Sequence, residues 1–176
     1  MTTAPDLVRQ RRLTVVVHGR PAPQGSKKYI GHRPNAASGR VSAVLVEQSK
    51  RVKPWRALVT AATQTAMTTA HIHKYGGYPA DGTQPLDGPL EAEIVFTVLK
   101  PASAPKRRRT WPTTRHSGDV DKLIRSTFDG IADGGGVIDD SRIIRVTATK
   151  TFPGEHPDAL AQPGAIIRLY TLGDPT

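Results

Sequence analysis

The chain has 176 residues, of which 37% are hydrophobic and 23% are charged, and its formal net charge at pH 7 is +10. This length suits one globular domain with a buried core. The absence of cysteine excludes disulfides, thiolate metal sites and cysteine nucleophiles, and no apolar run approaches the roughly 18 residues of a membrane span.

The excess of positive charge makes a polyanion such as nucleic acid the first candidate partner. Residues 1–12 lack the apolar middle region of a signal peptide, so we expect a cytoplasmic protein with no membrane association. We expect a single domain over residues 1–176, with flexible tails at residues 1–12 and 171–176.

The first half of the chain predicts a strand, a long basic loop and a helix. Residues 13–18 are apolar and β-branched, which is typical of a buried strand. Residues 19–40 are rich in turn formers and predict a basic loop with no regular element. Residues 40–46 either belong to this loop or form a short strand. From Pro54 to about Lys74, apolar residues recur at helical spacing, which predicts a helix.

The second half predicts three more strands, at residues 90–99, 143–151 and 165–170. A second basic loop covers residues 101–115, and a helix with one apolar stripe covers residues 119–133. Together these elements predict an α+β fold in the order β-α-β-α-β-β, with a mixed sheet of about four strands and two helices packed against it.

Acidic residues are concentrated in one segment of this basic chain. Residues 117–142 hold six of the 15 acidic residues, namely Asp119, Asp121, Asp129, Asp133, Asp139 and Asp140. Crowded carboxylates repel each other and raise each other's pKa unless a cation lies among them. The concentration therefore raises the question of which cation this segment binds.

The spacing suggests a metal site. Asp119 and Asp121 open the second predicted helix, and Asp139–Asp140 open the strand that follows. Because a helix start and a strand start can meet at one end of a sheet, we expect Asp119, Asp121 and one aspartate of the later pair to converge. Carboxylates without histidine or cysteine suit Mg²⁺ or Mn²⁺, which serve phosphoryl chemistry. Arg125, one turn into the helix, could hold the phosphate.

Each of these aspartates also has a structural explanation. Asp119 could cap the helix, and Asp121, Arg125 and Asp129 could form ordinary i,i+4 pairs on its surface. The pair Asp139–Asp140 could consist of turn residues. Spacing alone does not decide between a metal site and these structural roles.

Two basic clusters lie beside aromatic residues. One joins Lys27 and Lys28 to Tyr29, and the other joins Lys106, Arg107, Arg108 and Arg109 to Trp111. Such clusters suit contacts to phosphates and stacking on an unpaired base, although each could also be a solvated loop. As a set they indicate DNA binding.

The run GDVDKLIRSTFDGI, followed by GGGVIDDSRIIRVTATK, resembles the RusA family of Holliday-junction resolvases of bacteria, phages and prophages. The segment HGRPAPQGSKK is similar to that family's loop after the first strand, and the resemblance spans roughly residues 13–170. It implies a homodimeric, Mg²⁺-dependent endonuclease, with Mn²⁺ as a possible substitute. Its expected substrate is branched double-stranded DNA, with paired nicks in four-way junctions during recombination and repair.

The resemblance also implies roles for individual residues. The family's essential aspartates fall on Asp119, Asp121 and Asp140, with Asp139 beside the last as a further metal ligand. The family's essential lysine falls on Arg125. Arginine keeps the charge but not the compact ammonium or its capacity to lose a proton.

Lys122 stands where the best-studied form has asparagine, and we expect it to contact DNA. Two alternatives to junction resolution remain open. One is a DNA-binding or regulatory protein without catalysis, and the other is a metal-dependent nuclease that acts on flaps, forks or RNA.

Overall fold

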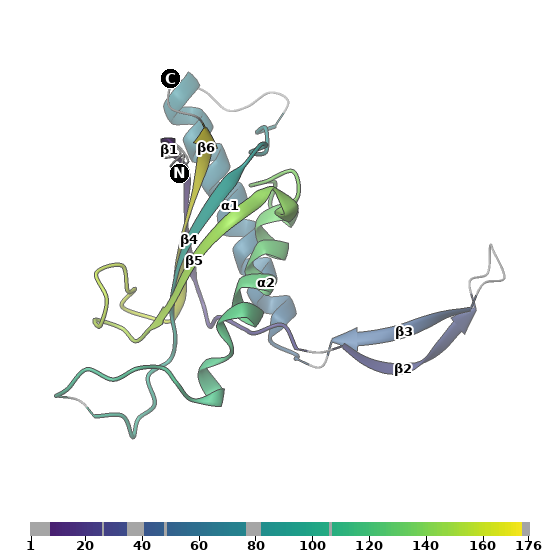
Figure 1. Ribbon diagram of the computed structural model, residues 1–176, viewed down its shortest axis with the longest axis vertical. Coiled ribbons are helices and arrows are strands. Elements are labelled where there is room, and N and C mark those ends of the chain that lie inside the picture. Colours follow the sequence, from purple (N-terminus) through teal and green to yellow (C-terminus); the bar gives the residue numbers. More distant parts are fainter. Residues whose placement is uncertain are drawn as a thin grey trace, which may run out of the picture.

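The computed structural model of the chain describes residues 8–25, 27–34, 41–47, 49–76, 82–105 and 107–173. Its body is a four-stranded mixed sheet with two helices on one face (Figure 1). This arrangement confirms the predicted α+β fold. No helix within the described ranges is long and apolar enough to cross a membrane.

The sheet has the strand order β1-β6-β4-β5. Strand β6 is antiparallel to both of its neighbours, whereas β4 and β5 are parallel. The bounds of the strands are Val8–His18 for β1, Leu90–Thr97 for β4, Ile143–Thr151 for β5 and Gly164–Gly173 for β6. The predicted strand at 143–151 is therefore confirmed, and β5 lies at one edge of the sheet.

The expected flexible tails are partly wrong. Strand β1 begins at Val8 and β6 ends at Gly173, and these two residues are partners in the register of the two strands. Residues 8–12 and 171–173 therefore belong to the sheet. The charged and polar residues at positions 9–12 concealed a strand that is exposed along this stretch.

The two helices, α1 (Val52–Tyr75) and α2 (Val120–Asp133), cross closely. At the crossing, a Cβ on Gly130 would lie only 2.7 Å from Cβ of Val59, so glycine permits the approach. The indole Nε1 of Trp55 donates to Oγ1 of Thr127 over 3.1 Å. The crossing fixes α2 against α1.

The core lies between the sheet and the helices. Alternate residues of the strands point toward the helices, as the period of two requires. The largest fully buried side chains are Trp55, Phe96, Leu90, Ile94, Leu123, Ile131, Ile167 and Leu169. Burying side chains of this size stabilises the fold by roughly 1.5–3 kcal/mol each relative to exposure.

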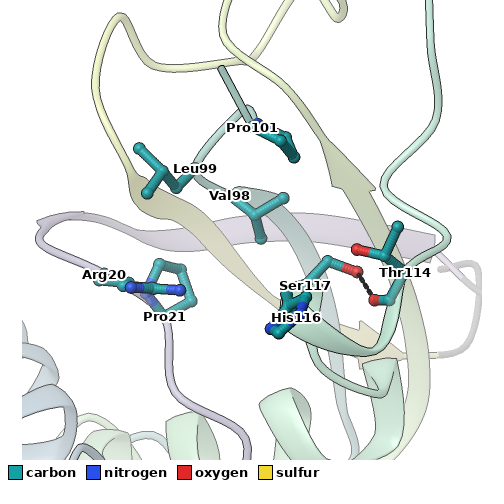
Figure 2. A pocket seen from close by; sticks show the side chains of 8 residues that line it. All are labelled: Arg20, Pro21, Val98, Leu99, Pro101, Thr114, His116 and Ser117. Atoms are coloured by element: carbon teal, nitrogen blue, oxygen red, sulfur yellow. Dashed lines mark hydrogen bonds between the residues drawn. The ribbon is translucent and has the colours of Figure 1, made fainter. Parts of the chain in front are cut away.

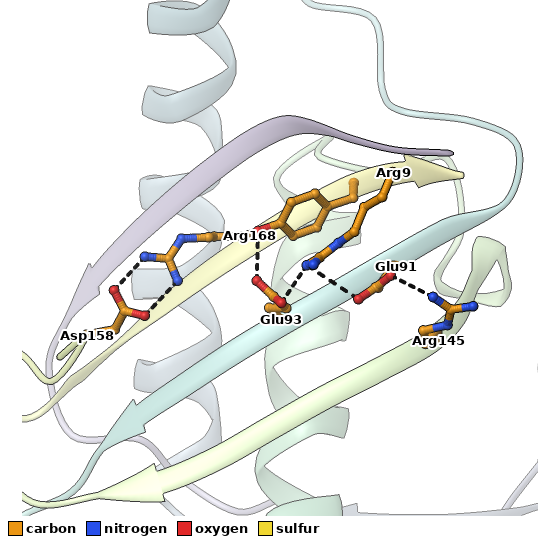
Figure 3. Close-up of polar contacts among 7 residues, drawn as sticks. Arg9, Glu91, Glu93, Arg145, Asp158 and Arg168 are labelled. Atoms are coloured by element: carbon orange, nitrogen blue, oxygen red, sulfur yellow. Dashed lines mark hydrogen bonds and ion pairs between the residues drawn. The ribbon is translucent and has the colours of Figure 1, made fainter. Parts of the chain in front are cut away.

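The other face of the sheet carries a network of charged groups (Figure 3). Arg9 pairs with Glu93 at 2.5 Å and with Glu91 at 3.4 Å, and Arg145 reaches Glu91 at 3.3 Å. Glu91 is only 4% exposed, so these guanidinium groups compensate a buried carboxylate. Tyr170 donates to Glu93 over 2.7 Å. The network stabilises the face that no helix covers.

A second, two-stranded sheet was not predicted in full. Strand β2 (Lys27–Pro34) pairs antiparallel with β3 (Val41–Glu47), and this hairpin projects from the body (Figure 1). The expectation of no regular element at residues 19–40 is thus wrong for β2. Strand β3 agrees with the short-strand alternative at 40–46. Glycine and proline in β2 obscured its strand character.

Candidate active site and nucleic-acid interface

The start of α2 presents two exposed carboxylates. Asp119 is the residue at the N-cap position, yet its side chain makes no capping hydrogen bond. It instead accepts a hydrogen bond from Nζ of Lys122 over 2.7 Å, and this bond lowers the pKa of Asp119. Asp121 lies in the first turn, where the helix dipole favours an anion. Asp119 therefore occupies the N-cap position, as the structural alternative has it, but its exposed carboxylate does not cap the helix.

The loop after β1 packs against this start of α2. The backbone N–H of Gln24 donates to the carbonyl of Lys122 over 3.0 Å, and Ser126 donates to the carbonyl of Ala22 over 2.7 Å. Gly118 has φ +79°, and a Cβ there would lie 3.0 Å from Cγ of Pro23. The proline- and glycine-rich segment of the sequence therefore forms one wall of the site.

An open groove of about 470 Å³ lies between that loop and α2. Its lining residues are Pro23, Gly25, Ser49, Arg115, Gly118, Asp119 and Lys122. The groove thus combines a carboxylate with two cationic side chains. This combination suits a metal-bridged phosphate better than a neutral ligand.

Lys150 and Arg115 also lie at the site, although neither was predicted as a site residue. Lys150, near the end of β5, donates to the carbonyl of Gly118 over 2.5 Å and to Ser117 over 3.1 Å. After the hydrogen bond from Lys122, the charges of Lys150 and Arg115 further lower the pKa of Asp119. The lone lysine at the end of an apolar and threonine-rich strand was the available signal for Lys150.

A small pocket of about 200 Å³ adjoins this region (Figure 2). Its walls are Pro21, Val98, Leu99 and Pro101, and its polar groups are Arg20, Thr114, His116 and Ser117. Ser117 is fixed because it donates to the carbonyl of Thr114 over 2.7 Å. The pocket therefore combines apolar walls with one guanidinium and three other polar side chains.

The second basic loop is partly described. The guanidinium of Arg109 lies 4.0 Å from the ring centroid of Trp111, which is 58% exposed. Arg107 and Arg108 are exposed, while Lys106 lies outside the described residues. In the first basic cluster, Lys27 and Lys28 lie on β2, and their side chains are also outside the described part.

Asp129 and Asp133 have structural roles in α2. Arg56 of α1 binds Asp129 at 3.3 Å and Asp133 at 3.1 Å. These two pairs join the helices at their crossing. Arg125, by contrast, is exposed one turn after Asp121.

Asp139 and Asp140 lie at the beginning of β5. The side chain of Ser141 and then its backbone N–H, which donates to Asp139 over 2.9 Å, lower the pKa of Asp139. Asp140 begins a single 3₁₀ turn, Asp140–Arg142, in which Arg142 pairs with Asp87 at 2.8 Å. The predicted turn role is therefore confirmed for Asp139, and Asp140 is exposed.

The expected convergence of the aspartates within one chain is wrong. Strands β4 and β5 are parallel, and α2 connects them in the chain, so α2 runs in the opposite direction to both strands. Its start therefore lies near the end of β5, at Lys150. Asp139 and Asp140 precede the start of β5. The 14 residues of α2 alone separate the two groups by about 20 Å. Among the residues that the structure describes, no three acidic or histidine side chains form a metal-binding group.

The sequence profile of the family described as endodeoxyribonuclease RusA matches residues 30–160. The chain belongs to the RusA family. It is therefore an endodeoxyribonuclease of the class that resolves Holliday junctions by acting on DNA phosphodiester bonds. A comparison with curated proteins finds no match. RusA nucleases in general depend on a divalent metal and bind branched DNA.

Proposed function

We propose that this RusA-family protein resolves four-way DNA junctions by paired, Mg²⁺-dependent nicks, as a homodimer in the cytoplasm during recombination and repair. The observation that carries the proposal is the pair of exposed carboxylates, Asp119 and Asp121, at a helix start surrounded by cationic side chains. A site with both charges can bind a metal ion and the DNA phosphate together.

The residues at the start of α2 fit a hard divalent ion. Their carboxylate oxygens are ligands that Mg²⁺ prefers, and Mn²⁺ accepts the same donors. When bound, such an ion neutralises charge on the phosphate and lowers the pKa of a water. Lys122, which now pairs with Asp119, would be free to contact a phosphate once the carboxylate binds the ion.

A single chain supplies only part of the ligand set. Asp139 and Asp140 lie beyond the opposite end of α2 from Asp119, and the helix alone is about 20 Å long. We therefore propose that a second copy of the chain brings Asp140, with Asp139 beside it, to the first two carboxylates. Two copies related by a two-fold axis would then form two such sites, as paired nicks require.

The remaining cationic residues would position the DNA. Arg125 and Arg115 are exposed near the two carboxylates, and Arg109 stacks on Trp111. Guanidinium groups bind phosphates through paired hydrogen bonds, and an exposed aromatic ring can stack on an unpaired base. From the sequence, we propose that Lys27, Lys28 and Lys106 also contact the DNA.

The test is nicking of an end-labelled four-way junction with and without Mg²⁺, using the natural protein and Asp121→Asn. We expect symmetric, Mg²⁺-dependent nicks that fall at least about 100-fold in the variant, because a metal ligand is lost. Asp133→Asn is the matched control. It removes the same charge at the other end of the same helix, where the carboxylate binds Arg56, and nicking should persist.

Three outcomes would contradict the proposal. Equal losses in both variants would mean that the effect is on folding. Tight junction binding without any nicks would favour a non-catalytic binding protein. Faster cutting of flaps or forks than of four-way junctions would assign the nuclease to another substrate.

A further inference from the structure

Lys150 is a half-buried lysine near the end of strand β5. Side chains of a strand alternate between its two faces, and Ala148, two residues earlier, packs against the core. Lys150 therefore extends from the sheet toward the helix layer, where α2 begins. Among the described residues, its partners are two neutral oxygens, the carbonyl of Gly118 at 2.5 Å and the hydroxyl of Ser117 at 3.1 Å.

The first of these bonds holds the peptide group that leads directly into Asp119. Gly118 has φ +79° and ψ 159°, a backbone conformation that is essentially restricted to glycine. Pro23 also packs against this residue, since a Cβ on Gly118 would lie 3.0 Å from Cγ of Pro23. Lys150 and Pro23 together therefore hold a backbone conformation that costs energy to maintain.

Asp119 depends on this peptide group for its orientation. A side chain at the N-cap position usually accepts a hydrogen bond from the first turn of the helix, and Asp119 makes no such bond. Its contact with Lys122 is a pair on the surface, which orders a side chain only weakly. The direction in which the carboxylate leaves the backbone is thus set mainly by the segment that Lys150 holds.

The second bond of Lys150 connects this segment to the basic loop. The hydroxyl of Ser117 lies 2.6 Å from the carbonyl of Pro112 and 2.7 Å from that of Thr114, so it donates within the loop while it accepts from Lys150. One ammonium group therefore joins the end of β5, the basic loop and the start of α2.

We propose that Lys150 is a positioning residue, whose ammonium group clamps the peptide between Gly118 and Asp119 so that Asp119 is oriented for the proposed metal ion. This inference rests on the function proposed above, and it adds a residue that acts through hydrogen bonds to the backbone without contacting the metal or the DNA. Groups that orient metal ligands typically contribute about 10–100-fold to metal affinity or activity.

Lys150→Cys tests the clamp without an assay of activity, because the chain has no other cysteine. Alkylation with 2-bromoethylamine restores an ammonium group at nearly the length of lysine, whereas iodoacetamide gives a neutral side chain. The backbone N–H groups of Ser117 and Gly118 donate to the carbonyls of Thr114 and Arg115. They should exchange with solvent at least about tenfold faster in the neutral variant, and aminoethylation should restore slow exchange.

Junction nicking gives the second readout. At a fixed Mg²⁺ concentration, the neutral variant should nick about 10–100-fold more slowly than the natural protein, and the aminoethylated variant should recover most of the rate. The Mg²⁺ concentration that gives half the maximal rate should rise in the neutral variant. Junction affinity without Mg²⁺ should change less than about threefold, because the ammonium group neutralises no phosphate.

Lys100→Cys is the matched control. Lys100 is also a half-buried lysine, shortly after β4, but it binds Glu155 at 2.7 Å and not the segment before α2. Neither alkylation of Lys100→Cys should change exchange at Ser117 and Gly118 or the rate of nicking. Equal losses in the two variants would overturn the inference, since the effect would then be on folding.

The results separate the clamp from the proposed function. Faster exchange that aminoethylation reverses, in a protein that nicks no junction, would support the clamp and reject the nuclease proposal. Nicking by the neutral Lys150→Cys variant at the natural rate and Mg²⁺ dependence would overturn the clamp alone. A junction affinity that falls as far as the rate would also overturn it, because Lys150 would then be a phosphate contact.

Discussion

The two ends of α2 carry the same residue type with different partners. At the start of the helix, Asp119 and Asp121 are exposed, and their neighbours are long, solvent-exposed cations such as Lys122. Toward the other end, Asp129 and Asp133 bind Arg56 of the neighbouring helix. The comparison shows that partner and position, not residue type, separate the aspartates at the proposed metal site from those that join the helices.

Arg125 gives the largest expected effect at the start of α2. Arg125→Ala should lower the nicking rate by about 100-fold, because it removes a cation that would stabilise charge on the phosphate. Arg125→Lys should retain most of the rate, since lysine keeps the positive charge. Single-turnover nicking rates at saturating Mg²⁺ measure both.

Lys74→Ala, at the last turn of α1, is the control for the loss of one positive charge. It should leave the nicking rate unchanged. Equal losses for Arg125→Ala and Lys74→Ala would show that only net charge matters. A lysine variant as slow as the alanine variant would show that the guanidinium itself is required.

Gly130 lies in the part of α2 that packs against α1, and its substitution tests how much this contact stabilises the fold. Gly130→Ala should lower the free energy of unfolding by about 1–3 kcal/mol, because the added methyl would overpack the crossing with Val59. Chemical denaturation measures the change. Gly173→Ala is the matched control, as nothing lies within 4 Å of a Cβ there. Equal stabilities of the two variants would mean that the helices separate without cost.

Arg115 should affect DNA affinity more than stability. Arg115→Ala removes one exposed cation from the groove, so junction affinity should fall several-fold and the salt dependence should lose a slope of about 0.9. Binding titrations at four salt concentrations measure both quantities. Lys74→Ala serves again as the control. An unchanged salt slope for Arg115→Ala would place the DNA elsewhere.

The smallest expected effect is a loss of folding stability at acid pH, which arises on the sheet face that carries the charged network. The hydrogen bond and charge of Arg168 lower the pKa of Asp158, and the hydroxyl of Tyr170 lowers the pKa of Glu93. Because both pKa values are lowered in the folded state, their stabilising contribution is complete above the ordinary carboxylate range and is lost as pH falls below about 4. Melting temperatures at neutral and acid pH measure the loss.

Asp158→Asn should flatten this pH dependence, since it removes one of the two carboxylates and its pair with Arg168 at 2.6 Å. The variant should therefore be less stable than the natural protein at neutral pH and differ little from it in acid. A pH profile that keeps its full slope in the variant would assign the acid sensitivity to other groups.

Much of the fold could be predicted from the sequence because the core segments have clear periodicity. The stripe of Leu123, Phe128 and Ile131 faces the core, and β5 has the bounds that its β-branched residues indicate. The hairpin β2–β3 was harder to predict, because Gly31 and Pro34 in β2 are typical of turns.

The site could be predicted only in part. Spacing along the chain identified the acidic segment, but the direction of α2 depends on the parallel pairing of β4 and β5, which no local pattern encodes. For the same reason, no local pattern connected Lys150 with Asp119. Both facts depend on which strands become neighbours in the sheet.

The central claim is that carboxylates from two chains complete each site. The most direct test mixes Asp121→Asn protein with Asp140→Asn protein, each inactive alone, and measures junction nicking. A mixed dimer holds one site with every carboxylate intact, so nicking should return to about one quarter of the natural rate, mostly as single nicks. A mixture as inactive as either variant alone would contradict the claim.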